Sequence, residues 1–298
     1  MGAAGEDSAA VSTTVSAVSG GQADLGRQDF ASFDFAFVDG LPRQRVGAGE
    51  LRIGLDEAHA GPGPAVLFIP GGYHGAWCYA GWLRHCRDTG IACAALDYRG
   101  HGALAYEGLA VDTSIEAYAE DTVLAARSFA APPIIVGHSL GGLVAMLAAT
   151  QTRIAGLALV APSPPGNLAG AHALPAVDER SLRPPPHRAE VVARFLGGYD
   201  GPHVEWCQHR LCAESPRALN QRYQLSVPID ASRIAAPSIV IEAGLDRSAR
   251  HPPGQDAALA QFLGGEFSCI DNAPHCLMLG TASRAALELL LAWRLRLD

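Results

Sequence analysis

The stretch Gly137-His138-Ser139-Leu140-Gly141 follows the apolar run Pro133-Ile134-Ile135-Val136 and precedes a segment of small residues, 142–149. This order predicts a strand, a sharp turn with a serine at its tip, and a helix. The glycines two residues before and after Ser139 leave room for the neighbouring strand and helix, because a Cβ at either position would strike them. The motif alone also occurs in ordinary turns. The flanking pattern therefore carries the interpretation of Ser139 as a nucleophile.

The composition is that of a globular chain with a large core. Of the 298 residues, 49% are hydrophobic and 17% are charged, and the formal net charge is −8. This acidic balance and the lack of a long basic run argue against a nucleic-acid partner. No apolar run approaches the roughly 20 residues that span a bilayer, so we expect no membrane partner either.

The seven cysteines form no C-x-x-C pair and show no spacing typical of metal ligands. We expect mostly buried thiols in a reducing compartment, which predicts a cytoplasmic protein and no metal site. Residues 1–30 are rich in Ala, Ser, Gly and Val but lack the Arg-rich start and continuous apolar core of a targeting segment. We expect a disordered tail there, and leave open a tail that packs on the body or on the partner subunit of a homodimer.

Strands and helices alternate along most of the chain. Alternating apolar residues at 33–37 and 51–55 predict two antiparallel edge strands, and continuous apolar runs further on predict buried strands. The alternation implies an α/β fold, with a mostly parallel central sheet flanked by helices, formed by residues 31–162 and 237–298. Residues 163–236 are Pro-rich and then helical. A connection of this length predicts a helical lid over the carboxyl ends of the strands.

A serine nucleophile needs an imidazole to accept its proton and a carboxylate to orient that imidazole. In a fold with this turn, the order along the chain is serine, acid, histidine. Asp246 follows the predicted strand 238–241 and is the expected acid, with Glu242 as the competing candidate nearer the strand end. His275 follows the last predicted strand, 266–270, and is the expected base.

An acyl-transfer site also needs two hydrogen-bond donors for the oxyanion that forms at the attacked carbonyl. One is the backbone N–H of Leu140, directly after the serine. The other is expected in the loop after the predicted strand 65–69, where Gly72 is the first choice and Tyr73 the alternative. The same Gly71-Gly72 pair would also fit a simple tight turn.

Taken together, these motifs resemble the α/β-hydrolase superfamily across about residues 31–298. The matching segments are Phe68-Ile69-Pro70-Gly71-Gly72, Asp97-Tyr98-Arg99-Gly100-His101-Gly102, Gly137-His138-Ser139-Leu140-Gly141-Gly142, Gly244-Leu245-Asp246 and Pro274-His275. Residues 71–77 are similar to the branch that contains small-molecule esterases and hydroxynitrile lyases. One departure is Pro70, where many members have His. The resemblance implies that Asp97 belongs to a structural turn rather than to the catalytic set.

We therefore expect a serine hydrolase that cleaves an ester or related acyl bond of a small, largely apolar molecule without a cofactor. Two alternatives stay open: a lyase, eliminase or acyltransferase of specialised-metabolite biosynthesis that uses the same residues, and a non-catalytic receptor for a small ligand. Candidate pocket residues share an aromatic or imidazole side chain near the expected site. They are Tyr73, His74, Trp77, His138 and Trp206.

Overall fold

A mixed eight-stranded sheet forms the centre of the molecule in the computed structural model, which describes residues 30–105 and 107–297. Apart from Phe30, the predicted tail therefore lies outside the described residues. The strands are β1 (Arg43–Val46), β2 (Gly49–Leu55), β3 (Val66–Ile69), β4 (Cys93–Asp97), β5 (Ile134–His138), β6 (Gly156–Val160), β7 (Ser238–Ala243) and β8 (Glu266–Ile270). Their order is β1-β2-β4-β3-β5-β6-β7-β8, with β1 and β2 antiparallel to their neighbours and the other strands parallel to one another.

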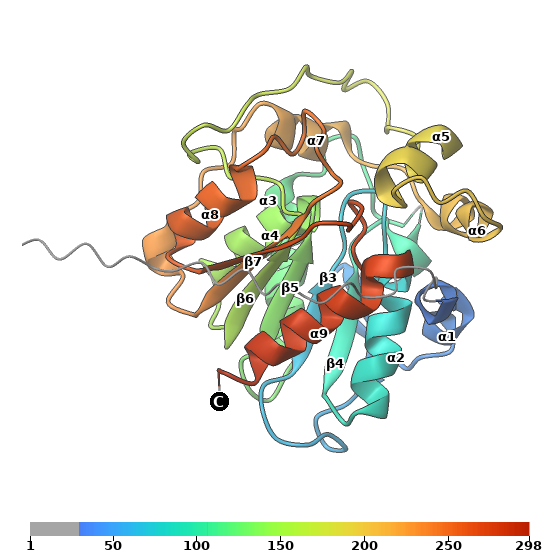
Figure 1. The fold of residues 1–298 in the computed structure, drawn as a ribbon, viewed down its shortest axis with the longest axis vertical. Helices are drawn as coiled ribbons and strands as arrows, with labels where there is room; N and C mark the ends of the chain where they lie inside the picture. The colour runs from blue at the N-terminus through green and yellow to red at the C-terminus, as the bar shows by residue number, and fades with distance from the viewer. Residues whose placement is uncertain (1–29, 106, 298) are drawn as a thin grey trace, which may run out of the picture.

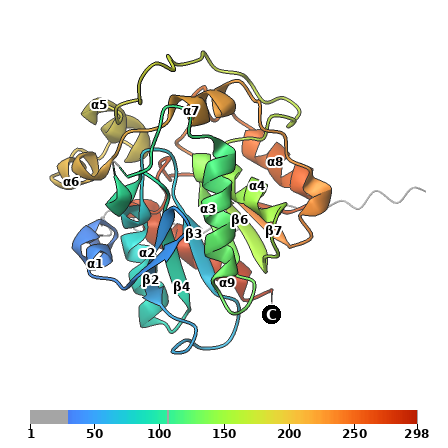
Figure 2. The ribbon, with the colours of Figure 1, turned by 180° about the vertical axis from the view of Figure 1, so that it is seen from behind.

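Helices cover both faces of this sheet: α2 and α9 lie over one face in Figure 1, and α3, α4 and α8 lie over the other in Figure 2. The α-helices are α1 (Phe35–Asp39), α2 (Ala80–Asp88), α3 (Ile115–Arg127), α4 (Leu140–Ala149), α5 (Arg188–Glu190), α6 (His203–Arg210), α7 (Pro216–Tyr223), α8 (Gln255–Leu263) and α9 (Ser283–Arg294). Short 3-10 helices are η1 (Phe30–Phe33), η2 (Ala76–Tyr79), η3 (Gly102–Leu104), η5 (Ala231–Arg233) and η6 (Gly280–Ala282). Within the described ranges, no helix is long and apolar enough to cross a membrane.

The continuous apolar runs are strands that are buried on both faces. In β3, Val66 and Phe68 pack into the core with α2 and α9, whereas Leu67 and Ile69 pack into the core with α3 and α4. Successive side chains of a strand point to opposite faces, so a strand covered on both sides needs apolar residues throughout. The predicted α/β class is therefore confirmed, together with the buried strands that define it.

The predicted edge strand at 33–37 is wrong, because this segment is helical. Asp34 caps α1 by accepting a hydrogen bond from the Phe37 N–H at 3.2 Å, and Phe33 ends the preceding η1. The alternating phenylalanines serve separate contacts: the Phe35 ring packs edge-on against Trp77 at 4.8 Å between centroids. The strand at 51–55 is confirmed as β2, and its antiparallel edge partner is β1.

The long connection between β6 and β7 is helical, with α5, α6, α7 and a π-helix, η4 (Val191–Phe195). In Figure 1, α7 lies above the upper end of the sheet, and α5 and α6 lie next to each other to its right. We call residues 161–237 the insertion. The first helical segment of the insertion consists of α5 followed directly by η4, and a single π-helical turn is a rare feature that is often found at functional sites.

Candidate active site

Ser139 occupies the turn between β5 and α4 with φ 52° and ψ −121°, outside the regions that L-residues favour. Its N–H donates to the Val160 carbonyl at 3.1 Å. Its own carbonyl accepts hydrogen bonds from the N–H groups of Gly142 at 2.9 Å and Ser163 at 2.8 Å. Three backbone contacts from α4, β6 and the insertion therefore hold this strained residue in place.

The glycines beside Ser139 are required by close backbone approach, as the sequence predicts. A Cβ on Gly137 would lie 2.5 Å from the Gly141 carbonyl oxygen in α4. A Cβ on Gly141 would lie 2.2 Å from the carbonyl oxygen of Pro70, just after β3. Both distances are shorter than non-bonded atoms allow, so larger side chains would push the strand and helix apart.

The structure brings the predicted nucleophile, base and acid into one hydrogen-bonded row. Ser139 Oγ lies 3.0 Å from His275 Nε2, and His275 Nδ1 lies 2.5 Å from Asp246 Oδ2. Burial disfavours the Asp246 carboxylate, but the charge and hydrogen bond of His275, together with nearby Arg194, outweigh burial and lower the Asp246 pKa. Glu242, the competing acid, instead lines a separate cavity beside Asp246.

Gly72 and Leu140, the predicted sources of the oxyanion donors, line the same cavity as Ser139, and their backbone N–H groups donate to no protein atom within the described residues. The alternative donor, the Tyr73 N–H, is already engaged, because it donates to Glu214 Oε2 at 3.2 Å. The geometry therefore favours Gly72 over Tyr73 as the second oxyanion donor.

His74 holds the loop that carries Gly72. Its Nδ1 lies 2.8 Å from the Gly72 carbonyl oxygen, and its ring stacks on Trp77 at 5.3 Å between centroids. Burial lowers the pKa of His74 to about 4, so the ring is neutral and its Nδ1–H is the donor to Gly72. At the start of this loop, the Pro70 carbonyl accepts from the Tyr98 hydroxyl at 3.2 Å.

Glu214, from the insertion, is a fully buried carboxylate that contacts the loop that carries Gly72 and Tyr73. Besides the Tyr73 N–H, it contacts His101 Nε2 at 3.1 Å and accepts from the Tyr118 hydroxyl at 2.6 Å. Burial disfavours the Glu214 carboxylate, but the charge and hydrogen bond of His101 outweigh burial, so the pKa of Glu214 is lowered. Burial likewise disfavours the His101 cation, yet Cys212 and Glu214 raise its pKa well above the ordinary value.

The π-helix η4 meets the loop that carries His275. The carbonyls of Arg194 and Phe195 accept hydrogen bonds from the N–H groups of His275 and Cys276, each at 3.2 Å. The Arg194 guanidinium also lies 3.1 Å from His275 Nε2, and its Nε lies 3.4 Å from Asp246 Oδ1. Burial lowers the pKa of His275 well below its usual range, and the adjacent Arg194 cation lowers it further.

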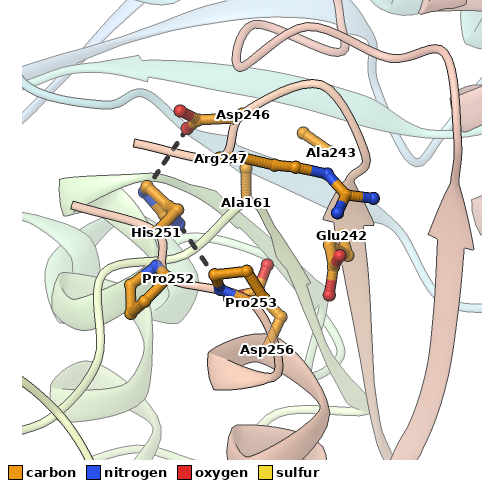
Figure 3. A pocket seen from close by; sticks show the side chains of 9 residues that line it. All are labelled: Ala161, Glu242, Ala243, Asp246, Arg247, His251, Pro252, Pro253 and Asp256. Atoms are coloured by element: carbon orange, nitrogen blue, oxygen red, sulfur yellow. Dashed lines mark ion pairs between the residues drawn. The ribbon is translucent and has the colours of Figure 1, made fainter. Parts of the chain in front are cut away.

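A smaller cavity of about 160 Å³ lies beside Asp246, and Figure 3 shows His251 between the carboxylates of Asp246 and Asp256. The separations are 3.8 Å to Asp246 Oδ2 and 3.9 Å to Asp256 Oδ1, longer than hydrogen bonds. Asp246, His251 and His275 place their ligand atoms within 4.8 Å of one another, as a metal site would. However, His275 already contacts Ser139 and Asp246 through its two nitrogens, and Arg194 puts a cation on the same carboxylate. These donors fit a catalytic row better than a metal site.

The main cavity has a volume of about 550 Å³ and contains Ser139 and His275 in its wall. Of the candidate pocket residues, Tyr73 and His74 line it. Trp77 is buried in the core, His138 is buried with its Nε2 2.9 Å from the His275 carbonyl, and Trp206 is 52% exposed on α6. These last three do not line the cavity. Sequence reasoning also missed Arg194, Glu214, Arg222 and His251, which come near the site only through the tertiary fold.

Removal of the Arg194 charge tests its effect on His275. His275 must be neutral to accept the proton of Ser139, and Arg194→Gln removes a cation that disfavours the protonated form. We expect the acid limb of kcat/KM for a neutral ester to move to higher pH by about one unit. The control Arg247→Gln changes an exposed arginine near Asp246 and is expected to leave the profile in place. An unmoved acid limb in Arg194→Gln would contradict this role.

Glu214→Gln tests the buried pair of Glu214 and His101, which supports the Gly72 loop. Breaking a buried ion pair costs about 3–5 kcal/mol of unfolding free energy, whereas the control Glu266→Gln breaks an exposed pair with Arg296 worth about 1 kcal/mol or less. The lowered Glu214 pKa contributes stability that is lost as pH falls through that pKa. The raised His101 pKa contributes stability that is lost as pH rises through it. In urea unfolding, the loss of unfolding free energy in Glu214→Gln should therefore be largest at pH values between these two pKa values. If the variant is as stable as wild type at every pH, the buried pair does not stabilise the fold.

Comparisons with known proteins place this geometry in a family. The model described as the alpha/beta hydrolase family matches residues 66–288. A methylesterase from Arabidopsis aligns with a TM-score of 0.61 and 15% identity, covering 77% of this chain and 98% of its own. Tomato Methylketone Synthase I aligns with a TM-score of 0.62 and 16% identity, covering 80% of this chain and 100% of its own. An enol-lactonase from Burkholderia xenovorans aligns with a TM-score of 0.62 and 20% identity, covering 84% of this chain and 98% of its own.

No protein among curated ones matches the sequence. At these low identities the solved structures establish the fold, and the family model covers most of the chain. The chain belongs to the alpha/beta hydrolase family.

Proposed function

We propose that this protein is a serine hydrolase that cleaves an ester or related acyl bond of a small molecule. The observation that carries the proposal is the hydrogen-bonded row of Ser139, His275 and Asp246 in the wall of a cavity, beside two unpaired N–H donors. Membership of the alpha/beta hydrolase family supports it. So does the similarity in fold to proteins named methylesterase and enol-lactonase.

In the proposed reaction, Ser139 Oγ attacks the ester carbonyl carbon while its proton passes to His275 Nε2. Asp246 keeps the Nδ1–H of His275 in place and stabilises the imidazolium that forms. The carbonyl oxygen becomes an oxyanion, which the N–H groups of Gly72 and Leu140 bind. Loss of one such donor typically costs about 3 kcal/mol of barrier stabilisation.

The tetrahedral intermediate then collapses, and the carbon–oxygen bond to the leaving alcohol breaks. The alcohol leaves with the proton from His275, and the acyl group stays on Ser139 as an ester. Water attacks this acyl-enzyme, again losing its proton to His275. The second tetrahedral intermediate then collapses, His275 gives this proton to the Ser139 oxygen, and the carboxylic acid is released.

Acyl transfer and elimination remain alternatives that use the same side chains. In acyl transfer another alcohol or amine replaces water in the second half of the reaction. In elimination no ester forms on Ser139. A trapped acyl-enzyme therefore separates hydrolysis and transfer from elimination, and the released acid separates hydrolysis from transfer.

A fluorophosphonate probe tests the nucleophile directly. We expect stoichiometric labelling of Ser139, since the neighbouring His275 activates its hydroxyl, and mass spectrometry of the labelled peptide identifies the residue. Ser139→Ala should abolish labelling, whereas Ser163→Ala and Ser248→Ala, which change the two other serines among the described residues of the cavity wall, should retain it. An unlabelled wild-type protein, or label on a residue other than Ser139, would refute the proposal.

A further inference from the structure

The main cavity concentrates positive charge in an acidic protein. Four arginines contribute to its wall, whereas Glu190 is the single acid among the described residues that line it. The whole chain carries a formal net charge of −8, so this cluster does not follow from composition. The arginines are Arg183, Arg194, Arg222 and Arg250.

Arg222, on α7, is the most deeply buried of these four, with 4% of its surface exposed. Its Nη2 donates to the Arg250 carbonyl at 2.8 Å, and its Nη1 is buried without a hydrogen-bond partner. Burial lowers the Arg222 pKa to about 10, which still leaves the guanidinium charged at neutral pH. A buried cation with an unused donor is costly unless an anion binds it.

The acids near the cavity are already paired with other arginines. Glu190 Oε1 lies 2.8 Å from Arg250 Nη1, and Asp246 Oδ1 lies 3.4 Å from Arg194 Nε. Within the described residues, no carboxylate lies within 4 Å of the guanidinium nitrogens of Arg222 or Arg183. The uncompensated positive charge in the cavity therefore belongs to these two side chains.

The rest of the wall is largely apolar. It includes aliphatic, proline and aromatic side chains from the insertion, such as Leu174, Val177, Pro185, Phe195 and Leu219. A molecule that fits this surface combines an apolar body with one anionic end. The guanidinium of arginine binds a carboxylate well, because its planar N–H groups match the two carboxylate oxygens.

We propose that the substrate carries a carboxylate, remote from the bond that Ser139 attacks, which binds Arg222. The substrate class is then an ester or lactone whose acyl part ends in a free acid, such as a half-ester of a short dicarboxylic acid. This inference rests on the proposed function for the reaction, but the carboxylate site stands on the cavity alone. It revises the expectation of a largely apolar substrate.

The test compares two esters with the same leaving group. Mono-4-nitrophenyl glutarate carries the free acid, and 4-nitrophenyl methyl glutarate has it capped. We expect wild type to prefer the charged ester by at least tenfold in kcat/KM, and Arg222→Gln to lose about 100-fold on that ester while changing little on the capped one. Arg233→Gln, an exposed arginine outside the cavity, is the matched control for net charge.

A wild-type enzyme without this preference, or an Arg222→Gln variant that keeps it, overturns the proposal. If the Gln variant does not fold, Arg222→Lys decides, because lysine keeps the charge but loses the planar fork. A weakened preference then supports the proposal, and an unchanged one contradicts it.

Binding in the absence of turnover separates this inference from the proposed reaction. Calorimetry with Ser139→Ala should show that monomethyl glutarate binds and that Arg222→Gln in the same background weakens binding at least tenfold. Binding without any ester hydrolysis by wild type would leave the carboxylate site standing while the hydrolase proposal fails. No binding to Ser139→Ala would count against the carboxylate site, whatever esters wild type cleaves.

Discussion

Ser139 adopts φ 52° and ψ −121°, which lifts its hydroxyl off the end of β5 and brings it within 3.0 Å of His275. Such a backbone conformation costs of the order of 1–3 kcal/mol and persists only where the surroundings enforce it. Here the close approach of α4 to β5 at Gly137, and to the end of β3 at Gly141, enforces it. The same packing places Leu140 at the first turn of α4 beside the Gly72 loop. The nucleophile and both donor positions therefore depend on the tight packing of α4 against β3 and β5.

The insertion contacts both loops that complete the site, the loop that carries His275 and the loop that carries Gly72. The carbonyls of Arg194 and Phe195 hold the His275 loop, and Glu214 engages the Tyr73 N–H. These contacts also set the electrostatics. Arg194 opposes protonation of His275, which must become positive during the reaction, so an anion in the cavity would offset part of that penalty. A carboxylate-bearing substrate would thus assist the base as well as satisfy Arg222.

Features encoded by neighbouring residues could be predicted, and features made by distant pairs could not. The sharp turn at Ser139, the buried strands and the order Ser139, Asp246, His275 follow from local patterns of glycine and apolar residues. The same alternation that marks β2 also occurs at 33–37, where the Asp34 cap produces a helix instead. The sequence left Gly72 and Tyr73 as alternatives because only the folded position of Glu214 distinguishes them. In the sequence, Arg222 cannot be distinguished from an exposed arginine on a helix, because its burial depends on the tertiary fold.

In the proposed reaction, Ser139, Gly72 and Leu140 converge on one reacting carbonyl. A crystal structure of the protein after reaction with a 4-nitrophenyl alkylphosphonate tests it most directly, since the bound phosphonate mimics the tetrahedral intermediate. We expect a phosphorus–oxygen bond to Ser139 Oγ and a phosphonyl oxygen about 3 Å from both the Gly72 and Leu140 nitrogens. A phosphonate on another residue, or a phosphonyl oxygen turned away from these two N–H groups, would contradict it.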